Sequence, residues 1–147
     1  MYNPNIWFES HPAYQIIIIC GDNMKIVWRQ ILGDGYLIRW VFDFGLFSIR
    51  LHKWSGSDDL RNPHDHAWNF TTIILKGLYE DVSPEGNEYC YTGTIKQRKA
   101  EHTHSVKLLS KTCWTLLFCG RERRSWGFWV KGKFVPRRRY FFKYKHH

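Results

Sequence analysis

The chain has 147 residues, enough to build one hydrophobic core and too few for two ordinary domains, so we expect a single domain over residues 1–147. Hydrophobic residues make up 44% of the sequence and aromatic residues 18%, which excludes a disordered protein. The formal net charge is +9. No stretch approaches the roughly 18 consecutive apolar residues of a membrane-spanning helix or has the pattern of a signal peptide, so we expect a soluble cytoplasmic protein without a membrane partner.

The net charge lies in the last part of the chain. Residues 1–120 contain 12 Lys and Arg against 12 Asp and Glu, whereas residues 121–147 contain 10 against 1. In this basic aromatic segment the cations alternate with aromatic residues, and it includes the run Arg137-Arg138-Arg139. Because cations neutralise phosphates and aromatic rings stack on bases, the segment predicts a nucleic-acid surface. The alternative is a solvated basic strand or helix whose aromatic residues pack on the rest of the domain.

Residues 1–23 form an N-terminal extension with one strand signal. Ile16 to Ile19 are four consecutive β-branched residues, typical of a buried strand or of a strand exchanged between the two copies of a homodimer. Gly21-Asp22-Asn23 predicts a turn, and Met24 is an alternative to Met1 as the native start.

Short apolar runs separated by turn signals continue along the chain. We expect strands over residues 25–32, 36–44 and 47–54, a hairpin with its turn at residues 83–87, and a strand over residues 116–119. Residues 93–99 predict a basic turn, and no segment shows the helical period of about 3.6 residues. Many short strands at intervals of about 8 to 12 residues predict an all-β fold, either an antiparallel sandwich or a barrel.

The cysteines give no sign of a disulfide framework. Cys20, Cys90, Cys113 and Cys119 lack Cys-x-x-Cys spacing, so we expect free thiols. Cys113 and Cys119 share one face of an apolar strand, which favours a buried hydrophobic role over that of a nucleophile or a metal ligand.

Two histidines stand at the entrance to an apolar strand. His64 and His66 are followed by Trp68 and Phe70, and on an extended strand residues two apart leave from the same face. Both imidazoles can then reach one metal ion, although two imidazoles alone leave a divalent ion under-coordinated. The alternative is a pair of partly exposed histidines without a ligand role.

Further candidate ligands come from neighbouring segments. The strand expected over residues 101–107 offers His102 and His104, which share a face. His52 lies on a strand whose inward face cannot be decided from parity. In the loop over residues 55–63, Asp58 and Asp59 are either acceptors for the second ring proton of a ligating histidine or solvated loop acids.

These pieces resemble the cupin superfamily, whose first motif is His-x-His followed by Glu and then Gly, and whose second motif carries one His. His64 and His66 match the pair, Gly77 matches the closing glycine, and the second motif implies His104 as a ligand, with His102 as a fourth ligand or a rim histidine. Phe70 stands in the Glu position and Asp58 in that of the leading glycine. The resemblance implies a cupin-type antiparallel β-barrel, also called a double-stranded β-helix or jelly roll.

More closely, the segment from Tyr36 to Tyr140 resembles a set of uncharacterised small cupins of bacteria and their phages. The matching pieces are Tyr36-Leu37-Ile38-Arg39-Trp40, Leu51-His52-Lys53, Ser57-Asp58-Asp59, His64-Asp65-His66-Ala67-Trp68, Cys113-Trp114-Thr115-Leu116, Trp126-Gly127-Phe128-Trp129 and Phe134-Val135-Pro136.

The absent carboxylate makes the three-histidine site of thiol dioxygenases the nearer comparison. The resemblance therefore implies a mononuclear non-haem Fe(II) dioxygenase-like enzyme that acts on a small molecule, with Zn, Ni or Mn as alternative ions. Trp68, Phe70 and Trp114 would line an apolar pocket, and Arg39 or Arg50 would pair with an acidic substrate. The alternatives are core packing for the aromatic residues and surface ion pairs for the arginines.

Two other functions fit the same sequence. One is a non-catalytic cupin that binds a ligand, or binds nucleic acid through Arg137, Arg138 and Arg139 of the basic aromatic segment. The other is a metal-free epimerase or isomerase that uses a histidine as its base.

Overall fold

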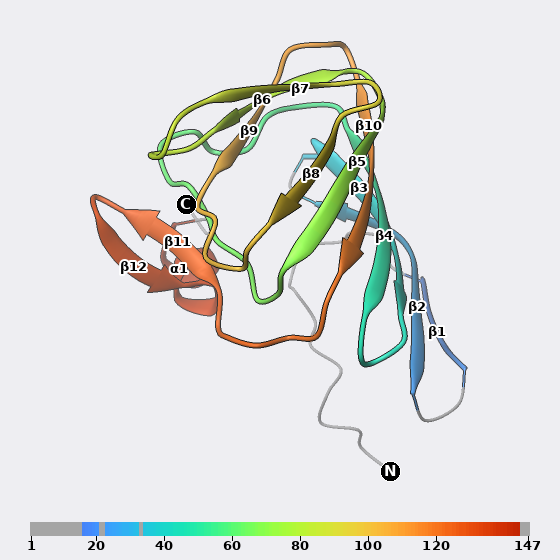
Figure 1. Cartoon of the computed structure of the whole chain (residues 1–147). Helices are drawn as coiled ribbons and strands as arrows, with labels where there is room; N and C mark the ends of the chain where they lie inside the picture. The colour runs from blue at the N-terminus through green and yellow to red at the C-terminus, as the bar shows by residue number, and fades with distance from the viewer. Residues whose placement is uncertain (1–15, 21–22, 33, 145–147) are drawn as a thin grey trace.

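The architecture is built from antiparallel strands (Figure 1). The structure, a computed structural model, describes residues 16–20, 23–32 and 34–144. Its elements are β1 (Ile16–Cys20), β2 (Met24–Leu32), β3 (Leu37–Asp43), β4 (Ser48–Trp54), β5 (Phe70–Lys76), β6 (Leu78–Val82), β7 (Glu88–Tyr91), β8 (Ile95–Arg98), β9 (Ser105–Leu108), β10 (Cys113–Cys119), β11 (Gly127–Val130), β12 (Lys133–Pro136) and α1 (Arg137–Tyr144).

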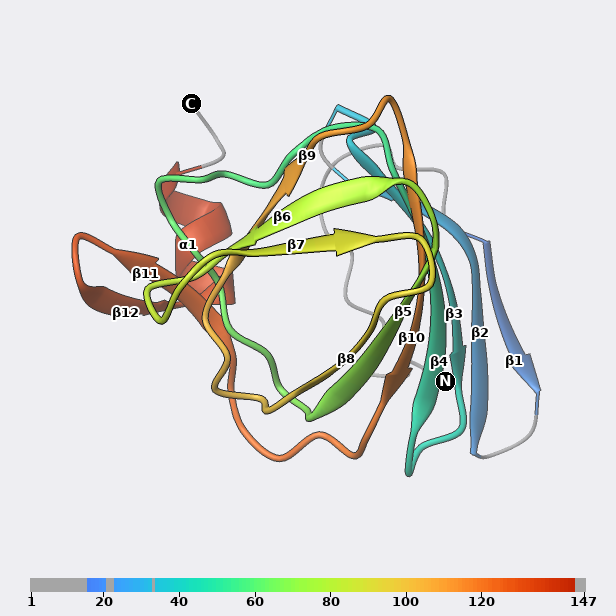
Figure 2. The same cartoon turned by 45° about the horizontal axis from the view of Figure 1, so that its top comes forward.

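Two sheets enclose the interior. Within the described residues, one sheet has the order β1-β2-β3-β4-β10-β5-β8 and the other the order β7-β6-β9. Figure 2 shows them curving around a barrel, with the β11-β12 hairpin and α1 beside it. Strand β10 lies between β4 and β5, so that Thr115 is paired with His52 on one side and with Ile74 on the other. The expectation of an all-β jelly roll is confirmed.

Alternating side chains of the large sheet point into the barrel, as the period of a strand requires. On β5 the buried residues are Phe70, Thr72 and Ile74, while on β10 they include Cys113 and Thr115. The hydrophobic core at one end of the barrel consists of Leu37, Trp54, Ile74, Tyr79, Cys90, Val106 and Cys113. Burial of each large side chain contributes about 1.5–3 kcal/mol to folding.

The cysteines of the described region are free thiols, as expected. Cys90, Cys113 and Cys119 are all buried and unpaired with one another. Burial raises the pKa of Cys113 to about 11, which keeps its thiol protonated at neutral pH. A packing role therefore holds for Cys113, while the side chain of Cys20 lies outside the described residues.

The strands predicted from the sequence correspond to β2, β3, β4 and the β6-β7 hairpin, and β10 begins three residues before the expected residue 116. β1 pairs with β2 of the same chain at the edge of the large sheet. Residues 1–15 and two residues of the predicted turn at 21–23 lie outside the described part of the chain.

One expectation of the sequence is wrong, and in the basic aromatic segment the open alternative of a helix with packed aromatic residues is observed. Residues 95–98 form strand β8 rather than a turn, because their backbone pairs with β5 at a sheet edge, where no apolar pattern is needed. Residues 137–144 form helix α1, which begins directly after Pro136. Tyr140 anchors this helix, since it is only 2% exposed and its ring stacks 3.8 Å from that of Phe128. One or two packed aromatics in so short a helix create no visible helical period.

No helix within the described segments has the length and hydropathy that a membrane crossing requires.

Replacement of Gly77 by Ala tests the close approach of β5 to the chain ahead of β10. Gly77 has φ +106°, and a Cβ there would lie 2.5 Å from the Thr112 carbonyl oxygen and 2.8 Å from Cys113 Cα. We expect Gly77→Ala to lower the free energy of unfolding by about 2–4 kcal/mol, because backbone strain and overpacking add. Urea unfolding measures this change. Gly35→Ala is the control, since Gly35 also has positive φ, +85°, but meets nothing within 4 Å; equal losses in both variants would contradict the steric argument.

Candidate metal centre

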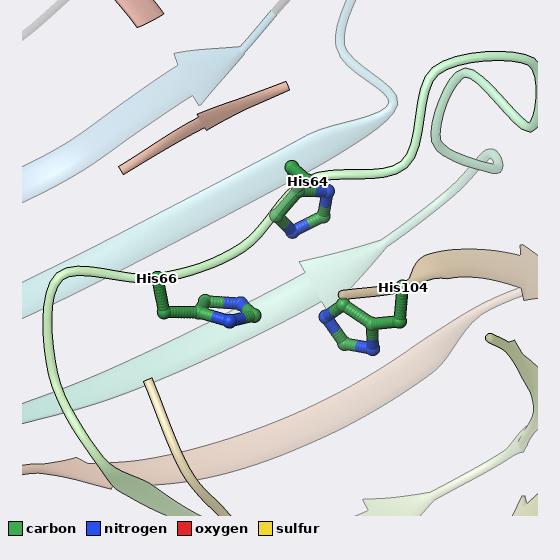
Figure 3. Close-up of side chains that lie close together, drawn as sticks. All are labelled: His64, His66 and His104. Carbon is green, nitrogen blue, oxygen red and sulfur yellow. The ribbon is translucent and has the colours of Figure 1, made fainter. Parts of the chain in front are cut away.

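Three of the predicted ligands converge inside the barrel. His64 and His66 lie in the loop between β4 and β5, and His104 lies just before β9. The ring centroids are 5.1 Å apart for His64 and His66 and 5.0 Å apart for His104 and each of the other two. Figure 3 shows the three rings turned toward a common space. One ring nitrogen from each lies within 4.8 Å of the others, which is close enough for one ion to bind all three.

Backbone hydrogen bonds hold these histidines in place. The His64 and His104 amides each donate to the carbonyl of the other at 2.9 Å, and the His66 amide donates to the Ala100 carbonyl at 2.9 Å. The expectation that His64 and His66 lie on one strand is wrong, because β5 starts only at Phe70 and His64 forms isolated bridges with His104 and Phe128. The two rings still converge because backbone hydrogen bonds fix the chain at His64 and again at His66.

Asp65, between the two histidines, points away from them. It is 1% exposed, accepts a hydrogen bond from the Gly127 amide at 2.9 Å and pairs with Arg124 at 2.9 Å. This carboxylate therefore attaches the β11-β12 hairpin to the loop.

Burial keeps the two loop histidines neutral. For His64, desolvation lowers the pKa to about 4 even though the Asp58 carboxylate, 3.9 Å from Nδ1, favours protonation. For His66, desolvation and the neighbouring His104 and His64 lower the pKa well below its ordinary value. A metal ion binds the unprotonated ring, so both side chains are in the ligand form at neutral pH.

Asp81 is the residue of the centre that the sequence analysis missed. This β6 residue is 2% exposed, and its carboxylate lies 3.0 Å from His104 Nδ1 and 3.2 Å from His102 Nε2. Burial by itself would raise the pKa of Asp81, but the hydrogen bonds from the two rings lower it well below the ordinary range, so the carboxylate is ionised. A carboxylate only accepts, so His104 carries its proton on Nδ1 and presents the Nε2 lone pair. A buried acid on a short strand far from the motif gives no sequence signal.

The other predicted ligands do not belong to the cluster of His64, His66 and His104. His102 bonds to Asp81 and so belongs to the layer behind His104, although Asp81, His102 and His104 form a second set with ligand spacing. Asp59 accepts hydrogen bonds from Arg61, Asn62 and Tyr140 rather than from a ligating histidine. His52 turns into the barrel, where it is 8% exposed.

The predicted pocket residues divide between the two faces of the sheet. Phe70 lies inside, with its ring 4.5 Å from that of His66, and Arg50 lies with its guanidinium 4.1 Å from the Trp68 ring. Trp114 is not a pocket residue: it stacks on Trp40 at 5.9 Å on the outer face. The strand period explains this, because the neighbours Cys113 and Thr115 are the ones buried inside.

The three arginines of the basic run also differ in their surroundings. Arg137 is half-buried with its guanidinium 5.5 Å from the Trp126 ring, whereas Arg138 and Arg139 are exposed.

Comparison with known proteins gives structural neighbours only. No protein-family model matches the sequence, and no curated protein matches it. A solved double-stranded β-helix domain protein from Klebsiella pneumoniae is 13% identical, covering 65% of this chain and 86% of its own, with a TM-score of 0.54. KdgF from Halomonas sp. is 16% identical, covering 65% and 87%, with a TM-score of 0.52.

A transcriptional regulator of the HTH_3 family from Vibrio cholerae is 11% identical, with a TM-score of 0.52 over 65% of this chain. The match spans 56% of that regulator, so this chain corresponds to little more than half of it. At such identities the neighbours establish architecture and not activity. Together with the two curved antiparallel sheets, they show that the chain has the double-stranded β-helix fold of the cupins.

Proposed function

We propose that this protein is a metal-binding cupin of the mononuclear non-haem Fe(II) dioxygenase type, acting on a small molecule. The observation that carries the proposal is the convergence of His64, His66 and His104, whose ring nitrogens lie within 4.8 Å of one another. The donor set fits such an ion, because imidazoles of lowered pKa bind divalent transition metals at neutral pH. His66 Nδ1 is also buried without a hydrogen-bond partner among the described residues, as expected of an atom kept for a ligand.

The choice of Fe(II) rests on the number and type of donors. Three neutral nitrogens leave further coordination positions for substrate and O₂, and a bound iron would supply the redox chemistry. Phe70 stands near His66 and His104, where it adds no charge to the donor set. Zn, Ni and Mn are the alternatives, since imidazole accepts several ions.

The protein's own side chains prepare this centre for chemistry. Asp81 holds the proton on His104 Nδ1 and so fixes the ring that faces His64 and His66. Phe70 and Phe128 pack against the histidine rings at 4.5 Å and 5.9 Å and exclude water from that side. We further propose a cytoplasmic location, in keeping with the three buried free thiols.

Metal analysis distinguishes the two possible donor sets. We expect untagged protein to bind about one equivalent of Fe(II) or Co(II), and His64→Gln to abolish this binding, because two imidazoles hold a divalent ion weakly. His102→Gln is the matched control and should keep the stoichiometry, since His102 Nε2 bonds to Asp81 and is not one of the three converging ring nitrogens. Elemental analysis and the visible spectrum of the Co(II) form provide the measurements. Loss of the ion in His102→Gln with retention in His64→Gln would place the metal at the other donor set.

Substitution of Asp81 tests its orienting role. We expect Asp81→Asn to weaken Co(II) affinity by about 10- to 100-fold, because the amide no longer holds the His104 ring with a charged acceptor. Glu80→Gln is the control on the same strand, since Glu80 pairs with Lys107 and with Asn87 instead. Competition calorimetry measures both affinities, and an unchanged affinity in Asp81→Asn would exclude the role.

We also propose a second candidate function, nucleic-acid binding by the basic aromatic segment. The observation in its favour is the exposure of Arg138 and Arg139 on α1 together with Phe142, which is 79% exposed. The adjacent hairpin adds Lys131 and Lys133, which are exposed as well. Exposed cations beside an exposed ring suit a single strand better than a duplex groove.

Salt dependence tests this second function. If single-stranded nucleic acid binds through α1, the Arg138→Gln/Arg139→Gln variant should bind more weakly and lower the slope of log affinity against log salt by about 1.4, roughly 0.7 for each lost phosphate contact. The control is Lys53→Gln/Lys76→Gln, which removes the same charge from the large sheet. Fluorescence anisotropy with a labelled oligonucleotide gives both slopes. Equal slopes for the two variants would rule out a specific role of α1.

A further inference from the structure

The inner face of the large sheet carries polar side chains that the metal centre does not use. His52 on β4 is paired with Arg39 of β3 on one side and with Thr115 of β10 on the other. Arg50 lies two residues before His52 on the same strand, and strand geometry directs both side chains to the same face. Arg39 donates from Nε to Gln30 Oε1 at 2.6 Å, which extends the polar row to β2.

The buried ring of His52 forms no hydrogen bond with any described residue. It is 8% exposed, and neither Nδ1 nor Nε2 has a partner among the described residues. Desolvation lowers its pKa well below the ordinary value, with Arg39 and Arg50 acting in the same direction, so the ring is neutral. A neutral imidazole has one donor and one acceptor, and each one left unpaired in the interior costs about 1–3 kcal/mol. A polar partner is therefore missing from this position.

Arg50 likewise lacks an oppositely charged partner among the described residues. Its Nε donates to Ser48 Oγ at 3.2 Å, and its guanidinium lies 4.1 Å from the centre of the Trp68 ring. Within the described part of the chain no carboxylate forms an ion pair with it, and Asp43 and Glu122 act only at longer range. Burial accordingly lowers the pKa of Arg50. A desolvated cation without a counter-ion is unfavourable unless an anion binds it.

Arg50 and His52 lie on the same inner face as the side chains that border the three histidines. Ser48, Cys119 and Phe70 are paired across β4, β10 and β5, and the Phe70 ring is 4.5 Å from that of His66. Arg50 donates a hydrogen bond to Ser48, the first of these three residues. It also touches Trp68, which follows His66 by two residues. A small molecule held by Arg50 therefore has a short path along the inner face to the metal centre.

We propose that Arg50 and His52 form an oxyanion subsite that holds a carboxylate or phosphate group of the substrate beside His64, His66 and His104. The guanidinium fork matches two oxygens of such a group, and the His52 ring adds one hydrogen bond. The assignment of the ligand as substrate rests on the proposed function. Binding of the anion itself needs only residues of the sheet, so it is measured without the ion.

The test uses the full chain freed of metal by dialysis against a chelator. At constant ionic strength the protein is titrated separately with acetate and with inorganic phosphate, while NMR follows the Arg50 Nε–H and His52 ring signals, assigned from the variants. We expect saturable shifts of both signals with one of the two anions, and the stronger one identifies the group. In Arg50→Gln the affinity should fall at least about tenfold, since a charge-assisted pair is lost. In His52→Gln, whose amide keeps a donor and an acceptor, it should fall only a few-fold.

Lys53→Gln is the matched control, because Lys53 lies on the same strand but on the outer face of the sheet. Its ammonium lies over the Trp114 ring, 5.7 Å from the ring centroid. This variant should bind the anion as the parent protein does. If Arg50→Gln proves unstable to urea, Arg50→Lys keeps the charge without the fork and should retain weaker binding. Absence of any shift in the parent protein, or equal losses in Arg50→Gln and Lys53→Gln, would overturn the subsite.

The outcome separates the subsite from the enzyme. Anion binding in a protein that takes up no metal would keep the subsite and remove the proposed function. Uptake of one metal ion by a protein that binds neither anion would do the reverse.

Discussion

The reciprocal backbone hydrogen bonds between His64 and His104 are the constraint on which the candidate site depends. These bonds join the loop before β5 to the strand β9, which belongs to the other sheet. Two such bonds contribute only about 1–3 kcal/mol, too little to order a long loop alone. The same seam continues where Asp58 accepts from the Val106 amide at 2.9 Å and Ser57 accepts from the Leu108 amide at 2.9 Å. The Asp58 and Ser57 side chains thus accept hydrogen bonds from β9 amides that a neighbouring strand would otherwise accept.

A network of charged and polar side chains around Asp81 holds the His104 side of this contact in place. Asp81 pairs in register with Val106, which brings its carboxylate to the rings of His102 and His104. Arg98 of β8 reaches Asp81 at 3.4 Å and Glu88 at 2.8 Å, so the carboxylate has a cation on its other side. Phe70 stands beside His66 and carries no charge, whereas the Asp81 carboxylate lies behind the His104 ring. We infer that the Asp81 carboxylate balances part of the charge of an ion bound by the three histidines, without ligating it.

The barrel interior is divided into an apolar end and a polar end. Trp54, Ile74 and Cys113 close one end as core, whereas the levels above them carry His52 and Arg50 on β4. Buried polar groups without partners destabilise a fold, so the unpaired His52 ring costs stability unless a ligand bonds to it. Trp68 contacts the Arg50 guanidinium and the Phe70 ring lies 4.5 Å from that of His66, so these two aromatic side chains line the inner face between Arg50 and the imidazole rings.

The sequence by itself determined what depends on local pattern. Alternating apolar residues with regular turn signals predicted the all-β fold, and the spacing of His64 and His66 with the second pair at His102 and His104 predicted a histidine cluster. Only the tertiary structure decided which groups meet. The pairing of β10 with β4 and β5 turned His52 inward and Trp114 outward, and the pairing of β6 with β9 brought Asp81 to His104. Helix α1 likewise forms because Tyr140 stacks on Phe128. These contacts join residues far apart in the chain, and no local pattern encodes their register.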